Sequence, residues 1–364
     1  MEIALKDDEK LLYSLRALYQ GYGYRSFRMS KFEKYELYAG NKDFLVNDRV
    51  ITFSDTNGDL LALKPDVTLS IVRSVKFRPG RKQKLYYHEN VYRPAAGSGR
   101  FREIMQCGLE CIGDLDSYDS YEVIALAERS LREISGESIL SFSHLGILKS
   151  LLKALGAEEA EQAELLKLIA ARSVHELAGL FERRGWDGEH LRELNELLAL
   201  SCGLRELPEA LRALGLRWLD KAVLGELEDL SRLAGEGDGI AQFDLSVIND
   251  IHYYNGVIFQ GFVKGISEKV LSGGRYDKLL ERMGQKGGAI GFAVYLSLLE
   301  PLRPAPAEYD ADVLLLYDRE TPLTAIRDTI ARLQAGGKSV SAQRSGAEGR
   351  YRETVDLRGG AEHA

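Results

Sequence analysis

The amino-acid sequence predicts an α+β fold, in which an antiparallel sheet is flanked by helices, interrupted by a helical insertion and followed by a short α/β region. Short, aromatic-rich segments separated by turn residues are typical of antiparallel strands. Between about residues 148 and 235 the composition changes to Leu, Ala, Glu and Arg with helical periodicity. Strand-like segments resume after that stretch, so the helices are expected to interrupt a sheet.

The first element expected is an amphipathic helix over residues 7–20. Apolar residues recur there at helical spacing behind Asp7 and Asp8, and Gly21 and Gly23 would end the helix. The strands expected next cover residues 24–29, 50–53, 60–63, 84–92 and 104–112. A second helix is expected over residues 118–134, with its apolar residues on the buried side.

The remaining elements complete a division into three regions. Within the helical insertion, Asp187 is expected to be an N-cap. Strands are expected at residues 243–248 and 253–263, an apolar helix at 292–302, and a linker at 303–306 before a strand, a helix and a strand at 312–317, 321–333 and 339–343. We therefore predict a discontinuous sheet domain (1–147 and 236–303), a helical insertion (148–235) and an α/β appendage (308–364).

Composition excludes several classes of function. The 364 residues are 45% hydrophobic and 28% charged, which is ordinary for a globular protein. A net charge of −7 argues against a nucleic-acid partner, because such affinity comes largely from Lys and Arg. The amino terminus lacks the apolar segment of a signal peptide, and no run is long enough to span a membrane, so a cytoplasmic protein is expected.

Neither a disulfide nor a metal site is expected. Cys107, Cys111 and Cys202 give an odd count, without a CxxC pair or a nearby histidine cluster. Reduced, partly buried thiols are the expected state. Asp250 is the one possible partner of His252 at ligand spacing, so neither metal binding nor a general-base role is expected there, and packing is the expected role of His88.

The segment LKPDVT, at residues 63–68, places a carboxylate and a hydroxyl two residues apart. If the segment is extended, Asp66 and Thr68 share a face and could both accept hydrogen bonds from an ammonium group. The alternative is that this pair belongs to a turn or a helix cap.

A second polar pair lies in IMQCGLECIG, at residues 104–113. Strand periodicity sends Gln106 and Glu110 to one face and leaves an apolar opposite face. Gly108 lies between them and leaves room for a small ligand. A solvent-facing edge is the alternative, although the segments HYYNG and LSGGRYD add further tyrosines and glycines suited to a pocket.

Four segments together resemble the catalytic domain of the histidyl-tRNA synthetase family. They are LKPDVT at residues 63–68, GRFREIMQCGLE at 99–110, YYNG at 253–256 and GGRYD at 273–277. They occur in the family's order and spacing, and the resemblance covers about residues 7–302. It implies the class II aminoacyl-tRNA synthetase fold, a mainly antiparallel sheet flanked by helices.

The same resemblance implies a histidine-binding pocket. It places Asp66 and Thr68 at the α-ammonium group. The other residues that it places around the ligand are Gln106, Glu110, Tyr253, Tyr254 and Tyr276. Arg93 is similar to the arginine of the family's second class II motif and completes the expected site.

Three departures from the family's pattern remove groups that would hold ATP. Pro, Ala and Ala occupy residues 94–96, where an acid is expected after Arg93. Leu298 stands where the family's arginine would hold the triphosphate, and Asn249 replaces the catalytic arginine. Each lost charge-assisted hydrogen bond is worth about 1.5–3 kcal/mol, and adenylation concentrates negative charge there. We therefore expect no catalytic residues and no cofactor, and weaker histidine binding than an arginine would give.

A chain with these departures and a shortened carboxyl-terminal region resembles the regulatory subunits of ATP phosphoribosyltransferase, which acts in the first step of histidine biosynthesis. The resemblance implies a hetero-oligomer with the short-form catalytic subunit, feedback by L-histidine, and self-association through the synthetase-like core. One alternative is a divergent histidyl-tRNA synthetase, and another is a synthetase paralogue with a different target. Leu298 and Asn249 argue against both alternatives.

Overall fold

The computed structural model describes residues 7–42, 45, 49–95, 99–235, 239–248, 253–302, 308–344 and 348–360. Its contacts divide the chain into two compact units, Met1–Leu302 and Arg303–Ala364, each with its own strands and helices. The helical insertion falls inside the first unit. The internal boundaries expected from the sequence, near residues 148 and 235, remain predictions.

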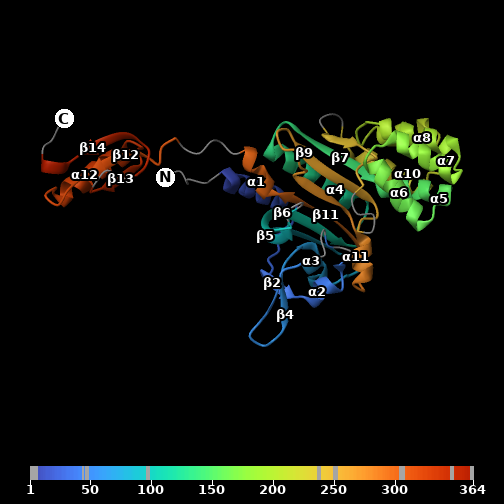
Figure 1. Ribbon diagram of the computed structural model, residues 1–364, viewed down its shortest axis with the longest axis horizontal. Helices are drawn as coiled ribbons and strands as arrows, with labels where there is room; N and C mark the ends of the chain where they lie inside the picture. Colours follow the sequence, from blue (N-terminus) through green and yellow to red (C-terminus); the bar gives the residue numbers. More distant parts are fainter. Residues whose placement is uncertain are drawn as a thin grey trace. The chain divides into compact units, whose positions relative to one another are not determined.

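An eight-stranded sheet organises the first unit (Figure 1). In chain order its strands are β1 (Arg25–Ser26), β5 (Lys82–Pro94), β6 (Phe101–Gly113), β7 (Ser138–His144), β8 (Ala241–Phe243), β9 (Val257–Val263), β10 (Leu271–Arg275) and β11 (Gly288–Tyr295). Their spatial order is β1-β5-β6-β11-β10-β9-β7-β8. Only the outer pairs, β1 with β5 and β7 with β8, are parallel, which confirms the expected mainly antiparallel sheet.

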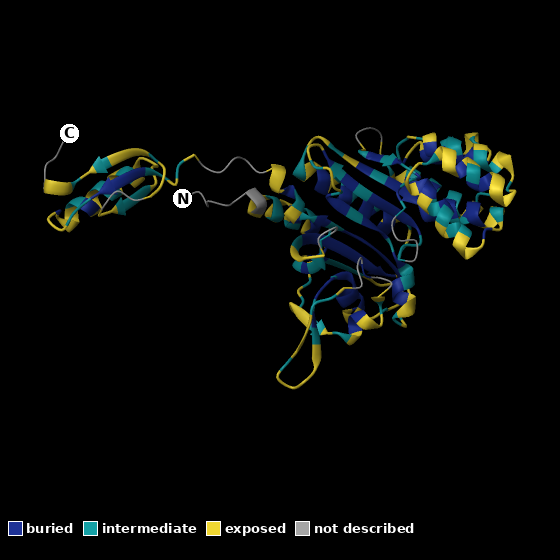
Figure 2. Ribbon diagram, in the orientation of Figure 1, coloured by how far each residue is buried: buried dark blue, intermediate teal, exposed yellow. Residues whose placement is uncertain are grey.

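Helices cover both faces of this sheet because successive strand residues point to opposite sides. On one face, Cys107 and Leu109 of β6 pack in a core with residues of α1 (Asp7–Gly21) and α4 (Ser117–Ile134). On the other face, Tyr87 and Ile112 pack with residues of α3 (Thr68–Ser74) and α11 (Asp277–Arg282). Figure 2 shows the central strands as the most buried part of the unit.

A small antiparallel sheet extends from the body of the first unit (Figure 1). It contains β2 (Phe32–Lys34), β3 (Thr52–Ser54) and β4 (Leu60–Leu63), in the order β2-β4-β3. In the chain, the short helix α2 (Glu36–Ala39) lies between β2 and β3. Most residues of β2 and β3 are exposed (Figure 2). The chain leaves β4 directly into the LKPDVT segment, so this small sheet leads to the start of α3.

The helical insertion is confirmed as a run of helices between β7 and β8. These are α5 (Leu145–Leu155), α6 (Glu159–Ala170), α7 (Val174–Arg184), α8 (Gly188–Ala199), α9 (Leu207–Ala213) and α10 (Lys221–Leu233). The expected N-cap is also confirmed, because the Asp187 side chain accepts a hydrogen bond from the Glu189 amide, 2.9 Å away.

Several expected elements were wrong in type or extent. Residues 292–295 belong to β11, and only the 3-10 helix η2 (Leu296–Leu302) follows. Strand β11 is hydrogen-bonded to β6 and β10 and covered on both faces, so its apolar run resembles a buried helix in the sequence. The expected strand at 243–248 ends at Phe243, because the Asp244 carboxylate accepts the Ser246 amide in a turn. Three other strands differ in extent from the prediction. The strand expected at 24–29 is β1 (Arg25–Ser26), the one at 50–53 is β3 (Thr52–Ser54), and the one at 253–263 is β9 (Val257–Val263).

The second unit is a small parallel α/β structure. Its elements are β12 (Ala311–Leu316), α12 (Leu323–Ala335), β13 (Val340–Gln343), β14 (Tyr351–Asp356) and the 3-10 helix η3 (Arg358–Gly360). The strand order is β13-β12-β14, and both pairs are parallel. The first three elements were expected, whereas β14 was missed because its sequence, YRETVD, is mostly polar. The expected linker at 303–306 lies outside the described residues.

Cys107 and Cys111 are buried free cysteines and Cys202 is a partly buried one. Within the described ranges, no helix is long and apolar enough to cross a membrane. Over the same part of the chain, no cluster of three His, Cys, Asp or Glu side chains is arranged to hold a metal ion.

Candidate functional site

Strand β6 forms the floor of the candidate site. Gln106 and Glu110 are both only 2% exposed and lie on the face opposite to Cys107 and Leu109, as strand periodicity predicts. Gly108 lies between them, where a Cβ atom would overlap the Phe292 carbonyl oxygen of β11. The expected strand and its polar face are therefore confirmed, and the alternative of a solvent-facing edge is wrong.

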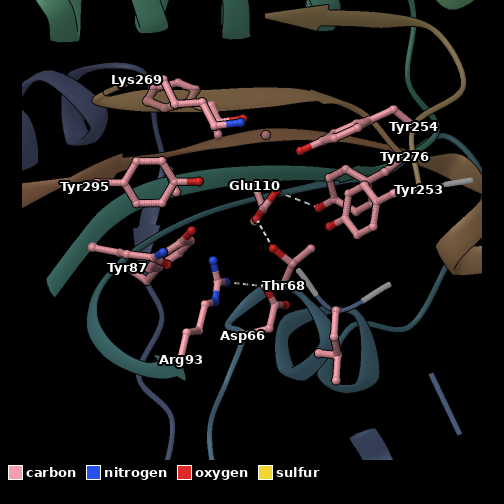
Figure 3. Close-up of a pocket in the computed structure, with 16 residues that line it drawn as sticks. Asp66, Thr68, Tyr87, Arg93, Glu110, Tyr253, Tyr254, Lys269, Tyr276 and Tyr295 are labelled. Atoms are coloured by element: carbon pink, nitrogen blue, oxygen red, sulfur yellow. Dashed lines mark hydrogen bonds and ion pairs between the residues drawn. The ribbon is translucent and has the colours of Figure 1, made fainter. Parts of the chain in front are cut away.

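The polar face of β6 opens into a cavity of about 290 Å³ (Figure 3). All eight residues expected from the sequence line it, namely Asp66, Thr68, Arg93, Gln106, Glu110, Tyr253, Tyr254 and Tyr276. The other lining residues are Leu45, Tyr87, Lys269, Ser272, Gly291, Phe292, Ala293 and Tyr295. The sequence segments that carry the resemblance thus meet around one small, largely buried space.

Glu110 lies at the centre of a hydrogen-bond network (Figure 3). The Thr68 hydroxyl donates to one carboxylate oxygen over 2.8 Å, and the Tyr276 hydroxyl donates to the other over 2.6 Å. Burial is the main influence on this group and raises its pKa to about 8, although both hydrogen bonds act in the opposite direction. At neutral pH most molecules therefore carry a protonated Glu110, which can both donate and accept a hydrogen bond.

Asp66 forms the charged pair of the pocket with Arg93. The Arg93 guanidinium lies 3.2 Å from one Asp66 oxygen, and its Nε donates to the Pro65 carbonyl oxygen. Burial raises the pKa of Asp66, while Arg93 and the amides of Thr68 and Leu69 oppose that rise. The pair fixes the orientation of the carboxylate beside the cavity.

The geometry of LKPDVT differs from the extended segment considered in the sequence. The Asp66 carboxylate accepts the Leu69 amide over 2.9 Å, and Thr68 is the first residue of α3. The alternative of a helix cap is therefore correct for Asp66, and a shared strand face is wrong. A carboxylate has two oxygens, so the second remains available to Arg93 while the first caps the helix. Asp66 therefore caps the start of α3 and lines the cavity at the same time.

Three tyrosines form an aromatic wall at the Glu110 side of the cavity (Figure 3). The ring centroids of Tyr253 and Tyr254 are 4.5 Å apart, and those of Tyr253 and Tyr276 are 5.5 Å apart. Burial is the main cause that raises the pKa of all three phenols, so they stay neutral hydrogen-bonding groups. A flat ring with polar edges, such as imidazole, suits this environment.

Sequence reasoning missed Tyr87, Lys269 and Tyr295. The strand register pairs Tyr87 with Gly108, and Tyr295 with Gln106, so correct alignment of β5, β6 and β11 would have found both tyrosines. Lys269 precedes β10 in an irregular segment and carries no sequence signal of its own.

The residues that depart from the synthetase pattern lie away from the cavity or outside the described ranges. Leu298, in η2, packs against the apolar core and is not a lining residue. Pro94 ends β5 directly after Arg93. Asn249, His252 and residue 96 lie outside the described residues. The described cavity can therefore hold a small zwitterion by hydrogen bonds and charge, and its lining contains one ammonium and one guanidinium group.

Comparison with known proteins agrees with this fold. The family model described as histidyl-tRNA synthetase matches residues 3–299. An ATP phosphoribosyltransferase regulatory subunit from Moorella thermoacetica is 31% identical over 332 residues, which cover 88% of this chain and 84% of that protein. The solved structure of an ATP phosphoribosyltransferase regulatory subunit/histidyl-tRNA synthetase from Bacillus halodurans C has a TM-score of 0.76 and 25% identity, covering 99% of this chain and 97% of that one.

A more distant structure shows the same fold in an assembly. A chain of the ATP phosphoribosyl transferase (HisG:HisZ) complex from Thermotoga maritima has a TM-score of 0.62 and 21% identity, covering 80% of this chain and 97% of that chain. The eight-stranded sheet and its buried cavity define a protein of the class II synthetase type. The chain belongs to the histidyl-tRNA synthetase family and, within it, to the regulatory subunits of ATP phosphoribosyltransferase.

Proposed function

We propose that this chain is a non-catalytic regulatory subunit that joins a separate short-form ATP phosphoribosyltransferase chain in the cytoplasm, supports its activity and carries feedback by L-histidine. The observation that supports this function best is the cavity itself. Eight polar or charged residues suited to an amino acid line it, whereas Leu298, at the position where the family's arginine would hold a triphosphate, packs against the apolar core. Binding without adenylation is the activity that such a site supports.

L-Histidine fits the polarity of the cavity. Asp66 and Thr68 present oxygen atoms to an α-ammonium group, and Asp66 is held in place by Arg93 and by the start of α3. A neutral imidazole has one nitrogen that donates a hydrogen bond and one that accepts it. A protonated Glu110 and the Tyr254 hydroxyl can each donate or accept, so together they can hydrogen-bond both nitrogens. The aromatic wall accepts the apolar faces of the ring.

Two arguments support a partner chain: the sequence lacks residues expected to hold ATP, and the named relatives are regulatory subunits. A subunit that binds an amino acid without reacting it can change a partner's activity only if the ligand binds two states of the assembly with different affinity. The named relatives are regulatory subunits, and the Thermotoga maritima structure is of a complex. We extend that arrangement to this chain, with self-association through its synthetase-like core.

Co-expression with a short-form catalytic chain tests the proposal. We expect the two chains to co-elute in gel filtration, and we expect the transfer of the phosphoribosyl group from phosphoribosyl pyrophosphate to ATP to require this chain. Added L-histidine should inhibit the complex, because a coupling free energy of about 1–3 kcal/mol gives a 5- to 150-fold change in affinity. A complex that carries Glu110→Ala should assemble and stay active but need about tenfold or more histidine for the same inhibition.

Three results would contradict the proposal. The catalytic chain could reach its full rate alone, it could show the same histidine response alone, or it could fail to co-elute with this chain under every condition. A Glu110→Ala complex that keeps the wild-type histidine response would show that feedback does not use this pocket, while the regulatory role itself would stand. Calorimetry of wild type, Glu110→Ala and Tyr254→Phe with L-histidine measures the pocket directly.

A further inference from the structure

The segments HYYNG and GGRYD contain polar residues that the proposed function has not used. Asn255 follows Tyr254, and Arg275 and Asp277 stand on either side of Tyr276. The described lining of the cavity includes both tyrosines but none of the three polar residues. These residues can therefore affect a bound ligand only through the tyrosines beside them.

Asn255, Arg275 and Asp277 bond the two segments to each other, and we call them the anchor cluster. The Asn255 amide donates to the Arg275 carbonyl oxygen over 2.9 Å, and the Asp277 amide donates to the Asn255 side-chain oxygen over 2.8 Å. One oxygen of the Asp277 carboxylate accepts the Asn255 side-chain amide at 3.1 Å and the Arg275 Nε at 2.8 Å. The other oxygen accepts the Ala289 amide of β11 over 2.8 Å. The backbone next to both tyrosines is therefore fixed to the same point of the sheet.

The helical insertion contacts the anchor cluster from two of its helices. From α5, the Lys149 ammonium donates to the Asn255 carbonyl oxygen over 3.4 Å. From α10, one carboxylate oxygen of Glu226 lies 3.8 Å from the Arg275 guanidinium, which makes an ion pair rather than a hydrogen bond. The insertion therefore places one cation and one anion against the cluster that fixes the tyrosines.

Glu226 is also held by the sheet. Its second carboxylate oxygen lies 3.2 Å from Nε2 of His144, a buried residue at the end of β7. Nδ1 of that ring accepts the Gly146 amide over 3.1 Å, so Nε2 carries the proton of the neutral ring and faces Glu226. Contact with His144 is the main influence that lowers the pKa of Glu226, and Arg275 acts in the same direction. The carboxylate is therefore charged at neutral pH and lies between β7 and the anchor cluster.

We infer that the helical insertion positions the histidine pocket, with Glu226 as the positioning residue that acts through Arg275 on the tyrosines of the aromatic wall. The inference rests on the proposed binding of histidine and adds a route by which the ligand affects a separate part of the chain. Coupling between two parts of a molecule is reciprocal, so an insertion that stabilises the pocket is itself stabilised by the bound ligand. L-Histidine should therefore stabilise α10, although no described residue of that helix lines the cavity.

Two variants on one helix separate this role from the general stability of the insertion. Glu226→Gln removes the charge that faces Arg275 and keeps an oxygen that can accept from His144. Glu228→Gln is the matched control, because Glu228 lies on the same helix and pairs with Arg212 of α9, inside the insertion. Calorimetry with L-histidine, and hydrogen exchange of the α10 amides with and without it, are measured on the full chain.

Arg275→Gln, alone and combined with Glu226→Gln, completes a double-mutant cycle for histidine affinity. Glu226→Gln should bind L-histidine about three- to tenfold more weakly than wild type, whereas Glu228→Gln should bind as wild type does. Arg275→Gln should also bind more weakly, and adding Glu226→Gln to it should cause no further loss, because the ion pair is already absent. L-Histidine should slow amide exchange in α10 of wild type and Glu228→Gln, and this protection should disappear in Glu226→Gln.

Four results would overturn the inference while histidine binding stands. They are wild-type affinity in Glu226→Gln, equal losses in Glu226→Gln and Glu228→Gln, additive losses in the double variant, and wild-type exchange in α10 that does not respond to saturating L-histidine. The exchange measurement on wild type needs no substitution, so it decides the question even if a variant folds poorly. A wild-type chain that binds no L-histidine would overturn both the inference and the proposed ligand.

Discussion

At the scale of single residues, the protonation of Glu110 couples the pocket to the stability of the chain. Its pKa of about 8 in the folded protein lies above the ordinary value of 4.5. Between those two pH values the folded state holds a proton that the unfolded state has lost. The free energy of unfolding contributed by this group is therefore full below about pH 4.5 and decreases as the pH rises to about 8.

Replacing Glu110 by Gln should remove this pH dependence. Glutamine keeps an acceptor for the Thr68 hydroxyl but cannot ionise. We expect the stability of Glu110→Gln relative to wild type to increase by about 3–4 kcal/mol between pH 5 and pH 8, since one pKa unit corresponds to about 1.4 kcal/mol. Urea unfolding of both proteins across that range measures the difference. Parallel stability curves would show that Glu110 is ionised at neutral pH in the folded state.

The residue scale also shows what the sequence can reveal about the site. Gln106 and Glu110 could be predicted because strand periodicity and family motifs both point to them, whereas Asp66 was found by the family motif alone and its helix cap was the alternative reading. Tyr87 and Tyr295 depend on which residues of neighbouring strands are paired, and that register follows only from the assembled sheet. Lys269 lines the cavity from an irregular segment before β10, and no local sequence pattern marks it.

At the scale of secondary-structure elements, close contact between β6 and β11 depends on glycine. Gly291 faces Glu110 across the two strands, and a Cβ atom there would overlap the Glu110 carboxylate and the Leu109 carbonyl oxygen. The Leu109 carbonyl belongs to the backbone of β6 and cannot move without disturbing the sheet. The absence of a side chain at Gly291 therefore permits both the pairing of the strands and the position of the central carboxylate.

Gly291→Ala should destabilise the first unit by about 1–3 kcal/mol, as overpacking generally does, and should abolish histidine binding. Gly225→Ala is the matched control, because Gly225 lies within α10 and no atom would approach its Cβ within 4 Å. The control should gain up to about 1 kcal/mol from the higher helix propensity of alanine. Urea unfolding and calorimetry check both variants. A Gly291→Ala protein with wild-type stability and affinity would contradict the close packing.

Element prediction succeeded where local signals agree and failed where tertiary burial overrides them. The helices α1, α4 and α8 have clear apolar periodicity, α4 and α8 also have side-chain N-caps, and in β6 polar and apolar residues alternate around Gly108. The segment at 292–295 was predicted as helix because both of its faces are apolar, and only its place between two strands makes it β11. The polar β14 was missed because its partner β12 supplies the buried residues of that pair.

At the scale of the whole molecule, the chain has the synthetase fold, and its sequence departs from the synthetase pattern at three places expected to hold ATP. We expect no histidine-dependent exchange of pyrophosphate into ATP above a no-protein control. The physical reason is the combined loss of the cations at positions 249 and 298 and of the acid after Arg93, each worth about 1.5–3 kcal/mol toward a transition state with concentrated negative charge. An intact histidyl-tRNA synthetase assayed in parallel is the positive control. Clear exchange by the purified chain would restore the synthetase alternative.

The two faces of β6 also bear on how such a molecule can change over time. Glu110 and Gln106 alternate along one strand with Cys107, Leu109 and Cys111, so cavity-lining and core-forming residues share the same backbone. Shifting that strand to rebuild the pocket would misplace the core. Leu298 lies in η2, outside the strands of the sheet, so a substitution there leaves the register of β6 unaltered. Evolution can therefore change residues outside the sheet without altering the strand that carries the cavity, so a fold of this kind can keep a polar cavity while its other functions change.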